Sequence, residues 1–232
     1  MTGESSFIRK LETPCLNQFL WVMAAGLLGL FISAVFSGVL RLPRTLFIVP
    51  YLLLVGPFLY AFIRWNKIDL LEQARRQWMW GLTGALVVAA FTVSNILSEP
   101  ASARPQGASL LFNLIWLGVV YGALDALLLS VMPILATRQA FSGLSRTNGW
   151  PICLAVGGIS LAASLFVTIA YHFGYPEFRG SEIIAPIIGN AVFSLSYLLT
   201  SNPLAPVVSH VVMHVAAVLH GFATTVQLPP HY

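Results

Sequence analysis

Residues 109–137 read SLLFNLIWLGVVYGALDALLLSVMPILAT, and Asp125 is the one charged residue in this run. A helix of roughly 20 residues crosses about 30 Å of hydrocarbon, so the run predicts a membrane-spanning helix with residues to spare for tilt or projection. A helix that begins near Ser109 places Asp125 close to the midplane of the bilayer. Because a charged side chain at that depth costs about 2.5–3.5 kcal/mol or more, Asp125 needs a partner or a function.

Six further runs of low charge surround this one. They lie at about 19–40, 46–63, 79–97, 150–172, 183–200 and 204–222. The chain of 232 residues is 57% apolar and only 9% charged, against about 25% charged in an average soluble domain. Its mean hydropathy is +0.82. This composition argues against a soluble enzyme, a disordered chain and a secreted disulfide scaffold. We therefore predict an all-α, polytopic integral membrane protein with about seven transmembrane helices.

The segments between these runs are too short for a soluble domain. The longest, 64–78, carries six charged residues and has the pattern of a short surface helix. Residues 201–203, Ser-Asn-Pro, leave only a tight turn between the last two runs, which predicts an antiparallel helical hairpin. We expect residues 1–108 to form three N-terminal transmembrane helices and residues 109–232 to form a core of four.

Basic residues are unevenly distributed between the two sides of the predicted bundle. The N-terminus and the loops 64–78 and 138–149 carry eight of the twelve Lys and Arg residues, and the opposite side carries four. Because cytoplasmic loops are enriched in Lys and Arg, this asymmetry predicts a cytoplasmic N-terminus and an external C-terminus. The same rule accounts for the net charge of +4, and no basic run with interleaved aromatic residues indicates a nucleic-acid partner.

Histidines concentrate in the last three runs or at their edges. His210 and His214 are four residues apart, so a helix places both rings on one face. The string HVVMH has the spacing of the HExxH metal motif, but Val211 occupies the position of its general-base glutamate, so that class of protease is not supported. The paired imidazoles are consistent with a metal site and equally with hydrogen-bonded packing. His220 lies about 240° around the helix from His214 and is predicted to be interfacial.

Asp125 and its neighbours limit the chemistry further. The acid is interpreted either as an interhelical hydrogen-bonding group or as a metal ligand or proton-handling carboxylate, because acids inside membranes are functional by default. Gly118 and Gly122 form a GxxxG step beside it, which permits close approach of another helix backbone. Aspartyl proteolysis needs two acids that share a site. Asp125 is the one charged residue in its run, so this mechanism is not supported. Adjacent Ser209 and His210 are badly placed to act as nucleophile and base.

The chain has an acid in one helix, then a helix that ends in His, then a tight hairpin whose second helix carries HxxxH. This order resembles the CPBP family of intramembrane metalloproteases, which includes the CAAX prenyl proteases. That family carries the motifs EExxxR, FxxxH and HxxxN or HxxxD. Here YGALD, residues 121–125, stands where the first motif begins, and TIAYH, residues 168–172, stands at the second. The stretch SNPLAPVVSH, residues 201–210, resembles the approach to the third motif, with His214 in the position of the Asn. The similarity covers about residues 110–222.

This resemblance implies an intramembrane metal-dependent protease that acts on a peptide or a prenylated protein at the cell membrane. The family pattern implies His172, His210 and His214 as metal ligands, with Asp125 as a ligand or as the base that activates water. Zn²⁺ is the expected ion, although imidazole also suits other divalent metals.

Several features of the family are missing. The paired Glu is reduced to Asp125, the motif's Arg is absent from residues 126–130, and Thr168 replaces Phe. A chain that keeps the fold without proteolysis, as a membrane scaffold or an immunity-type protein, is therefore the main alternative. The third alternative is a small histidine-containing transporter, or a haem protein ligated by His172 together with His210 or His214.

Depth in the membrane sets a further condition on the site. His172 ends the fifth run, whereas His210 lies about six residues, or roughly 9 Å, into the seventh run, which starts from the opposite side. The two histidines meet only if the fifth helix ends within the membrane or residues 173–182 fold back as a re-entrant segment.

Overall fold

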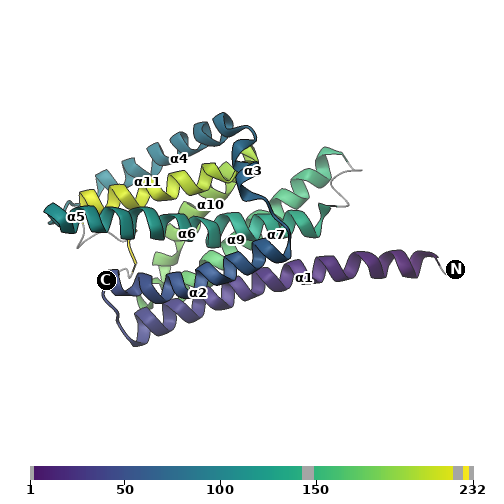
Figure 1. Cartoon of the computed structure of the whole chain (residues 1–232), viewed down its shortest axis with the longest axis horizontal. Helices are drawn as coiled ribbons and strands as arrows, with labels where there is room; N and C mark the ends of the chain where they lie inside the picture. The colour runs from purple at the N-terminus through teal and green to yellow at the C-terminus, as the bar shows by residue number, and fades with distance from the viewer. Residues whose placement is uncertain (1–2, 143–148, 222–226, 230–232) are drawn as a thin grey trace.

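The computed structural model describes residues 3–142, 149–221 and 227–229, and every regular element among them is helical. Figure 1 shows these elements as an elongated bundle with α1 along one side. The all-α prediction is confirmed. In chain order the elements are α1 (Gly3–Ile32), the π-helical η1 (Ser33–Val39), α2 (Arg44–Trp65), α3 (Leu70–Arg75), α4 (Trp78–Ser98), α5 (Gly107–Asn113), η2 (Leu114–Tyr121), α6 (Gly122–Ala126), η3 (Leu127–Val131), α7 (Met132–Ala140), α9 (Trp150–Phe173), the 3₁₀ helices η4 (Pro176–Phe178) and η5 (Ser181–Ile183), α10 (Ile184–Thr200) and α11 (Leu204–His220).

Six helical stretches are long and apolar enough to cross a membrane, and they begin and end close to predicted runs. They cover Cys15–Val39, Arg44–Trp65, Trp78–Ser98, Gly107–Ala140, Trp150–Phe173 and Ser181–Thr200. The seventh predicted run corresponds to α11, an apolar helix of 17 residues. The chain is therefore a multi-pass membrane protein, as its composition predicts. Residue 222 of the seventh run and residues 143–148 of the 138–149 loop lie outside the described residues.

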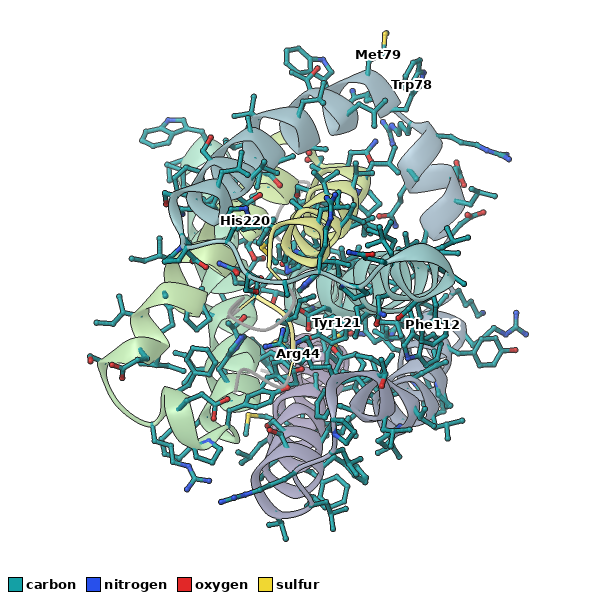
Figure 2. The ribbon with its side chains drawn as sticks, turned by 90° about the vertical axis from the view of Figure 1, so that its left-hand side faces the viewer. Arg44, Trp78, Met79, Phe112, Tyr121 and His220 are labelled. Atoms are coloured by element: carbon teal, nitrogen blue, oxygen red, sulfur yellow. The ribbon has the colours of Figure 1, made fainter. Side chains whose placement is uncertain are left out.

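The outer surface of the bundle carries large apolar side chains that a soluble protein would bury. Leu199 is 84% exposed, and Figure 2 shows Trp78 and Met79 projecting from the rim. Trp65, Trp78 and Trp150 are exposed and lie at the ends of helices. Indole side chains in such positions mark the level of the lipid headgroups. This pattern assigns the outer surface to contact with lipid.

The last helix, α11, packs between α4 and the long fourth span, which runs from α5 to α7 (Figure 1). Glycines in the fourth span let it pack closely against α11. A Cβ atom at Gly118 would lie 3.3 Å from the Cα atom of Val215, and one at Gly122 would lie 3.1 Å from that of Val211. The GxxxG step therefore provides the close helix contact that its spacing predicts, and its partner is the backbone of α11.

A tight turn at residues 201–203 joins α10 to α11, as predicted. Ser201 adopts the left-handed backbone conformation, with φ of 52°. The Asn202 side chain accepts a hydrogen bond from the backbone N–H of Leu204 at 2.9 Å and donates one to the backbone oxygen of Arg76 at 2.7 Å. Asn202 thus satisfies the first turn of α11 and ties the hairpin to the connector before α4. This contact fixes the depth at which α11 enters the bundle.

Candidate metal centre

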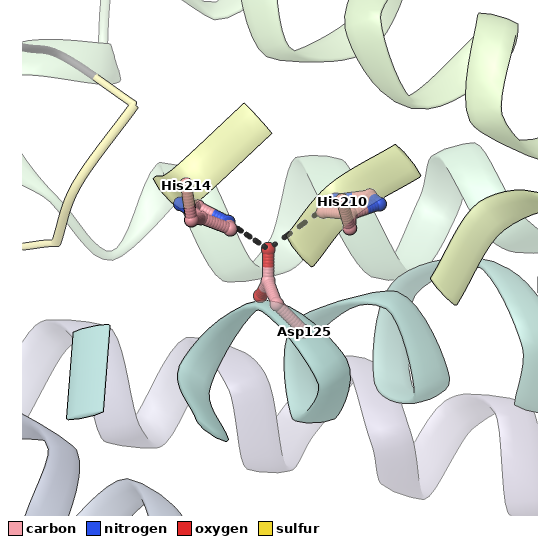
Figure 3. Close-up of side chains that lie close together, drawn as sticks. All are labelled: Asp125, His210 and His214. Atoms are coloured by element: carbon pink, nitrogen blue, oxygen red, sulfur yellow. Dashed lines mark ion pairs between the residues drawn. The ribbon is translucent and has the colours of Figure 1, made fainter. Parts of the chain in front are cut away.

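Three titratable side chains meet in the interior of the bundle, as Figure 3 shows. Asp125 projects from α6, and His210 and His214 project from one face of α11. The Nε2 atoms of His210 and His214 lie 3.6 Å and 3.8 Å from the same carboxylate oxygen, Oδ2 of Asp125. All three residues are buried, with exposed fractions of 4% for Asp125, 3% for His210 and 2% for His214. A group of this kind inside a membrane protein indicates a function.

Local sequence explains why these side chains converge. His210 and His214 are about one turn apart, so their rings follow one another along one face of α11. Gly122, three residues before Asp125, lets that face come close. A Cβ atom at Gly122 would lie 3.0 Å from Cδ2 of His214 and 3.3 Å from the backbone oxygen of His210. The structure thus brings together three of the four predicted site residues.

The spacing of the donor atoms suits a metal ion. One ligand atom from each of Asp125, His210 and His214 belongs to a set whose members all lie within 4.8 Å of one another. The Nε2 to Oδ2 distances of 3.6 Å and 3.8 Å exceed the range of hydrogen bonds, about 2.7–3.2 Å. Two donors that each lie about 2.1 Å from a tetrahedral zinc ion are roughly 3.4 Å apart. The observed separations are therefore close to those of a tetrahedral site.

Ring nitrogens of both histidines lack hydrogen-bond partners within the part of the chain that the structure describes. They are Nδ1 of His210 and both Nδ1 and Nε2 of His214. A buried polar atom without a partner costs about 1–3 kcal/mol. An ion bound at Nε2 of His214 would remove one of these costs, so the unsatisfied nitrogen is a second indication of a metal site.

Asp125, His210 and His214 line a cavity of about 430 Å³. Phe193 of α10 lies against the group, with its ring centroid 3.7 Å from that of His210. Phe91 of α4 and Ile188 of α10 also line the cavity, and they are 47% and 54% exposed. The cavity therefore extends toward the lipid-facing surface between α4 and α10.

His172, the fourth predicted site residue, lines the same cavity but lies outside the three-residue group in the described part of the chain. Its Nδ1 donates a hydrogen bond to the backbone oxygen of Thr168 at 2.9 Å, and its ring packs 5.2 Å from that of Phe178. After α9 ends at Phe173, the chain passes through η4 and η5 before α10 begins. The expected difference in depth between His210 and His172 stays a prediction. The role of His172 as a metal ligand also stays a prediction.

The fourth histidine of the last three runs, His220, lies at the C-terminal end of α11, away from the other two in that helix. Its Nε2 donates a hydrogen bond to the backbone oxygen of Glu99 at 2.8 Å. The Glu99 carboxylate in turn accepts a hydrogen bond from Gln227 at 3.0 Å, and both of these residues line the cavity. His220 therefore joins the ends of α4 and α11 at the edge of the cavity.

A tyrosine that the sequence analysis did not single out completes the surroundings of Asp125. The hydroxyl of Tyr51, on α2, donates a hydrogen bond to Oδ1 of Asp125 at 3.1 Å. Next to it, the hydroxyls of Tyr121 and Tyr171 lie 2.8 Å apart, and Tyr175 donates to Tyr171 at 2.6 Å. All four tyrosines are at most 1% exposed. The only signal in the sequence is that a buried phenol requires a hydrogen-bond partner, and this signal does not say which partner.

A second polar network, also missed by the sequence analysis, lies beside the cavity. Asn190 of α10 accepts a hydrogen bond from the hydroxyl of Ser130 at 2.7 Å, and it donates to the hydroxyls of Ser164 at 2.9 Å and Thr168 at 2.6 Å. These hydrogen bonds join α9 and α10 to η3. Thr168, which stands where the CPBP pattern has Phe, is therefore part of a buried polar contact one turn before His172.

No family model, curated protein or solved structure matches the sequence. The fold and the site by themselves define a multi-pass helical membrane protein in which a buried group of Asp125, His210 and His214 could hold a metal ion.

Proposed function

We propose that this protein is an intramembrane metal-dependent hydrolase, a divergent protease related to the CPBP family. The observation that carries the proposal is the buried group of Asp125, His210 and His214, in which two Nε2 atoms lie 3.6 Å and 3.8 Å from one carboxylate oxygen at the wall of a cavity. The order of features along the chain, an acidic helix followed by a hairpin whose second helix carries HxxxH, supports the family assignment.

In this proposal Nε2 of His210, Nε2 of His214 and Oδ2 of Asp125 hold the ion. Imidazole and carboxylate donors suit Zn²⁺, although other divalent metals accept the same set. Three protein ligands leave a fourth position open, and Zn²⁺ in such a site lowers the pKa of bound water to about 7 and polarises a carbonyl oxygen. The separations of 3.6 Å and 3.8 Å between each Nε2 atom and Oδ2 support Asp125 as a ligand more than as the base that activates water.

The walls of the cavity support a substrate that arrives from the bilayer. Phe91, Ile188 and Phe193 are apolar, and the first two are exposed on the lipid-facing side. We infer that a membrane-borne peptide segment or a prenylated protein enters here and is cleaved at the cell membrane. The exposed Asn95, a polar residue in the same wall, could then hydrogen-bond the backbone of a bound peptide.

The rival function is a membrane scaffold or immunity-type protein without catalysis. One observation favours it: among the described residues, the three-residue group contains a single carboxylate. If Asp125 is a metal ligand, no second acid within the group takes a proton from water. Hydrolysis would then require a bound ion to lower the pKa of water without help from a carboxylate base in the group.

The metal content of the purified protein, measured together with hydrolysis of membrane peptides, separates these functions. We expect stoichiometric zinc in the wild type, loss of zinc and hydrolysis in the His210→Ala, His214→Ala double variant, and retention of both in a His220→Ala control. Bound metal without hydrolysis would favour the scaffold. Absence of metal from a wild type reconstituted with Zn²⁺ would refute the proposal, and a haem protein would show an intense visible absorbance instead.

A further inference from the structure

Tyr51 reaches the candidate metal centre from a helix that contributes none of its proposed ligands. Its hydroxyl donates to Oδ1 of Asp125 at 3.1 Å, while the other oxygen, Oδ2, faces His210 and His214 at 3.6 Å and 3.8 Å. Tyr51 is fully buried, with no exposed surface. The two carboxylate oxygens therefore have different partners: one is occupied by a phenol, and the other points to the imidazoles.

The tyrosine is held in this position by its neighbours. Its ring packs 5.1 Å from the ring of Tyr121, 5.9 Å from that of Tyr171 and 6.1 Å from that of Phe47. The hydroxyls of Tyr121 and Tyr171 are already hydrogen-bonded to each other at 2.8 Å. Because a phenol has one proton to donate, the hydrogen bond to Asp125 uses the only donor that Tyr51 has.

We propose that Tyr51 is a positioning residue of the metal centre, which occupies Oδ1 of Asp125 so that the carboxylate binds the ion through Oδ2 alone. This inference rests on the proposed metal site. Metal ligands are commonly oriented by outer hydrogen-bond partners, and loss of such a partner typically lowers metal affinity or activity 10–100-fold. Here the phenol restrains rotation of the carboxylate and keeps Oδ1 from becoming a second donor to the ion.

Purified protein reconstituted with Co²⁺ or Zn²⁺ tests this role. The variant Tyr51→Phe removes the hydroxyl and keeps the ring, and Tyr175→Phe makes the same change at a buried tyrosine whose hydroxyl bonds to Tyr171. We expect Tyr51→Phe to weaken Zn²⁺ binding by about 10–100-fold and to change the visible spectrum of bound Co²⁺, because the carboxylate becomes free to bind through both oxygens. Tyr175→Phe should keep the wild-type affinity and spectrum.

A double-variant cycle separates positioning from packing. If Tyr51 acts through Asp125, then Tyr51→Phe should have no further effect on metal affinity in an Asp125→Ala background. Should Tyr51→Phe not yield folded protein, Tyr51→Met, which also lacks the donor and fills irregular space, takes its place in the same measurements.

Three outcomes would overturn the inference. Wild-type affinity and an unchanged Co²⁺ spectrum in Tyr51→Phe would refute the positioning role of Tyr51 but would not contradict the proposed metal centre. Equal losses in Tyr51→Phe and Tyr175→Phe would assign the effect to packing of the tyrosines. If the wild type binds Co²⁺ no better than the His210→Ala, His214→Ala double variant, the metal centre and the role of Tyr51 are both refuted.

Discussion

Gly122 sets the distance between the helix that carries Asp125 and the helix that carries the two histidines. Replacing it with alanine therefore tests the geometry of the candidate metal centre without replacing a proposed ligand. The added methyl group would stand 3.0 Å from Cδ2 of His214 and 3.1 Å from the Cα atom of Val211. The second of these neighbours is backbone, so a change of rotamer cannot relieve the contact.

The magnitude of the effect follows from these distances. Carbon atoms are best separated by about 3.5–4.0 Å, so α11 must retreat from Gly122→Ala by roughly 0.5 Å. Distances from a metal to its donors tolerate only about 0.2 Å of error. The two imidazoles move together with α11, whereas Asp125 stays on the opposing helix. We therefore expect Zn²⁺ affinity to fall at least about tenfold, which corresponds to about 1.4 kcal/mol.

Competition with a chromogenic chelator measures this affinity in detergent-solubilised protein. Gly157→Ala is the matched control, because it adds the same methyl group within a membrane helix, α9, where no atom lies within 4 Å of the new Cβ. The control should bind Zn²⁺ as the wild type does. If Gly122→Ala also binds with wild-type affinity while remaining folded, the contact with α11 does not set the site and the reasoning is wrong.

Three further changes test other parts of the structure. Asp125→Asn should weaken Zn²⁺ binding and hydrolysis together if the carboxylate is a ligand; hydrolysis lowered about 10²–10⁴-fold with metal retained would identify it as the general base, so both are measured on one sample. Asn190→Ala removes the hydrogen bonds to the side chains of Ser130, Ser164 and Thr168, each worth about 0.6–1.7 kcal/mol inside a membrane. The unfolding temperature in detergent should drop, and an unchanged temperature would contradict a stabilising network. Single cysteines at the exposed positions Leu71 and Arg104, in a variant without Cys15 and Cys153, should react from opposite sides of the membrane, with Leu71 cytoplasmic. Labelling of both from one side would refute the crossing of α4.

Helices and the core of the site could be predicted because their signals are local. An uncharged run of sufficient length is a membrane helix wherever it occurs, and a spacing of four residues places His210 and His214 on one face in any fold. The glycines at 118 and 122 indicate a close contact in the same way. Such signals do not identify the partner helix, which the structure shows to be α11.

Contacts between distant helices could not be predicted in this way. Tyr51 is 74 residues from Asp125, and nothing in the apolar run around it indicates that α2 passes beside α6. Asn190 lies 60 residues from Ser130 and 22 from Thr168, so their network appears only when three spans are packed. His172 shows a different limit: the family resemblance implies that it is a ligand, while its level in the membrane depends on where α9 ends.

The shortness of α11 bears on the lipid around the protein. Its 17 residues extend about 26 Å, which is less than the roughly 30 Å of an average hydrocarbon layer. A helix shorter than the hydrocarbon layer can be accommodated by local thinning of the bilayer or by flanking side chains that reach the interface. Because α11 carries His210 and His214, a thinned bilayer would bring headgroups and water closer to these histidines than a bilayer of average thickness would. If the protein is the hydrolase proposed above, shorter acyl chains should therefore give faster hydrolysis of the same substrate than longer ones.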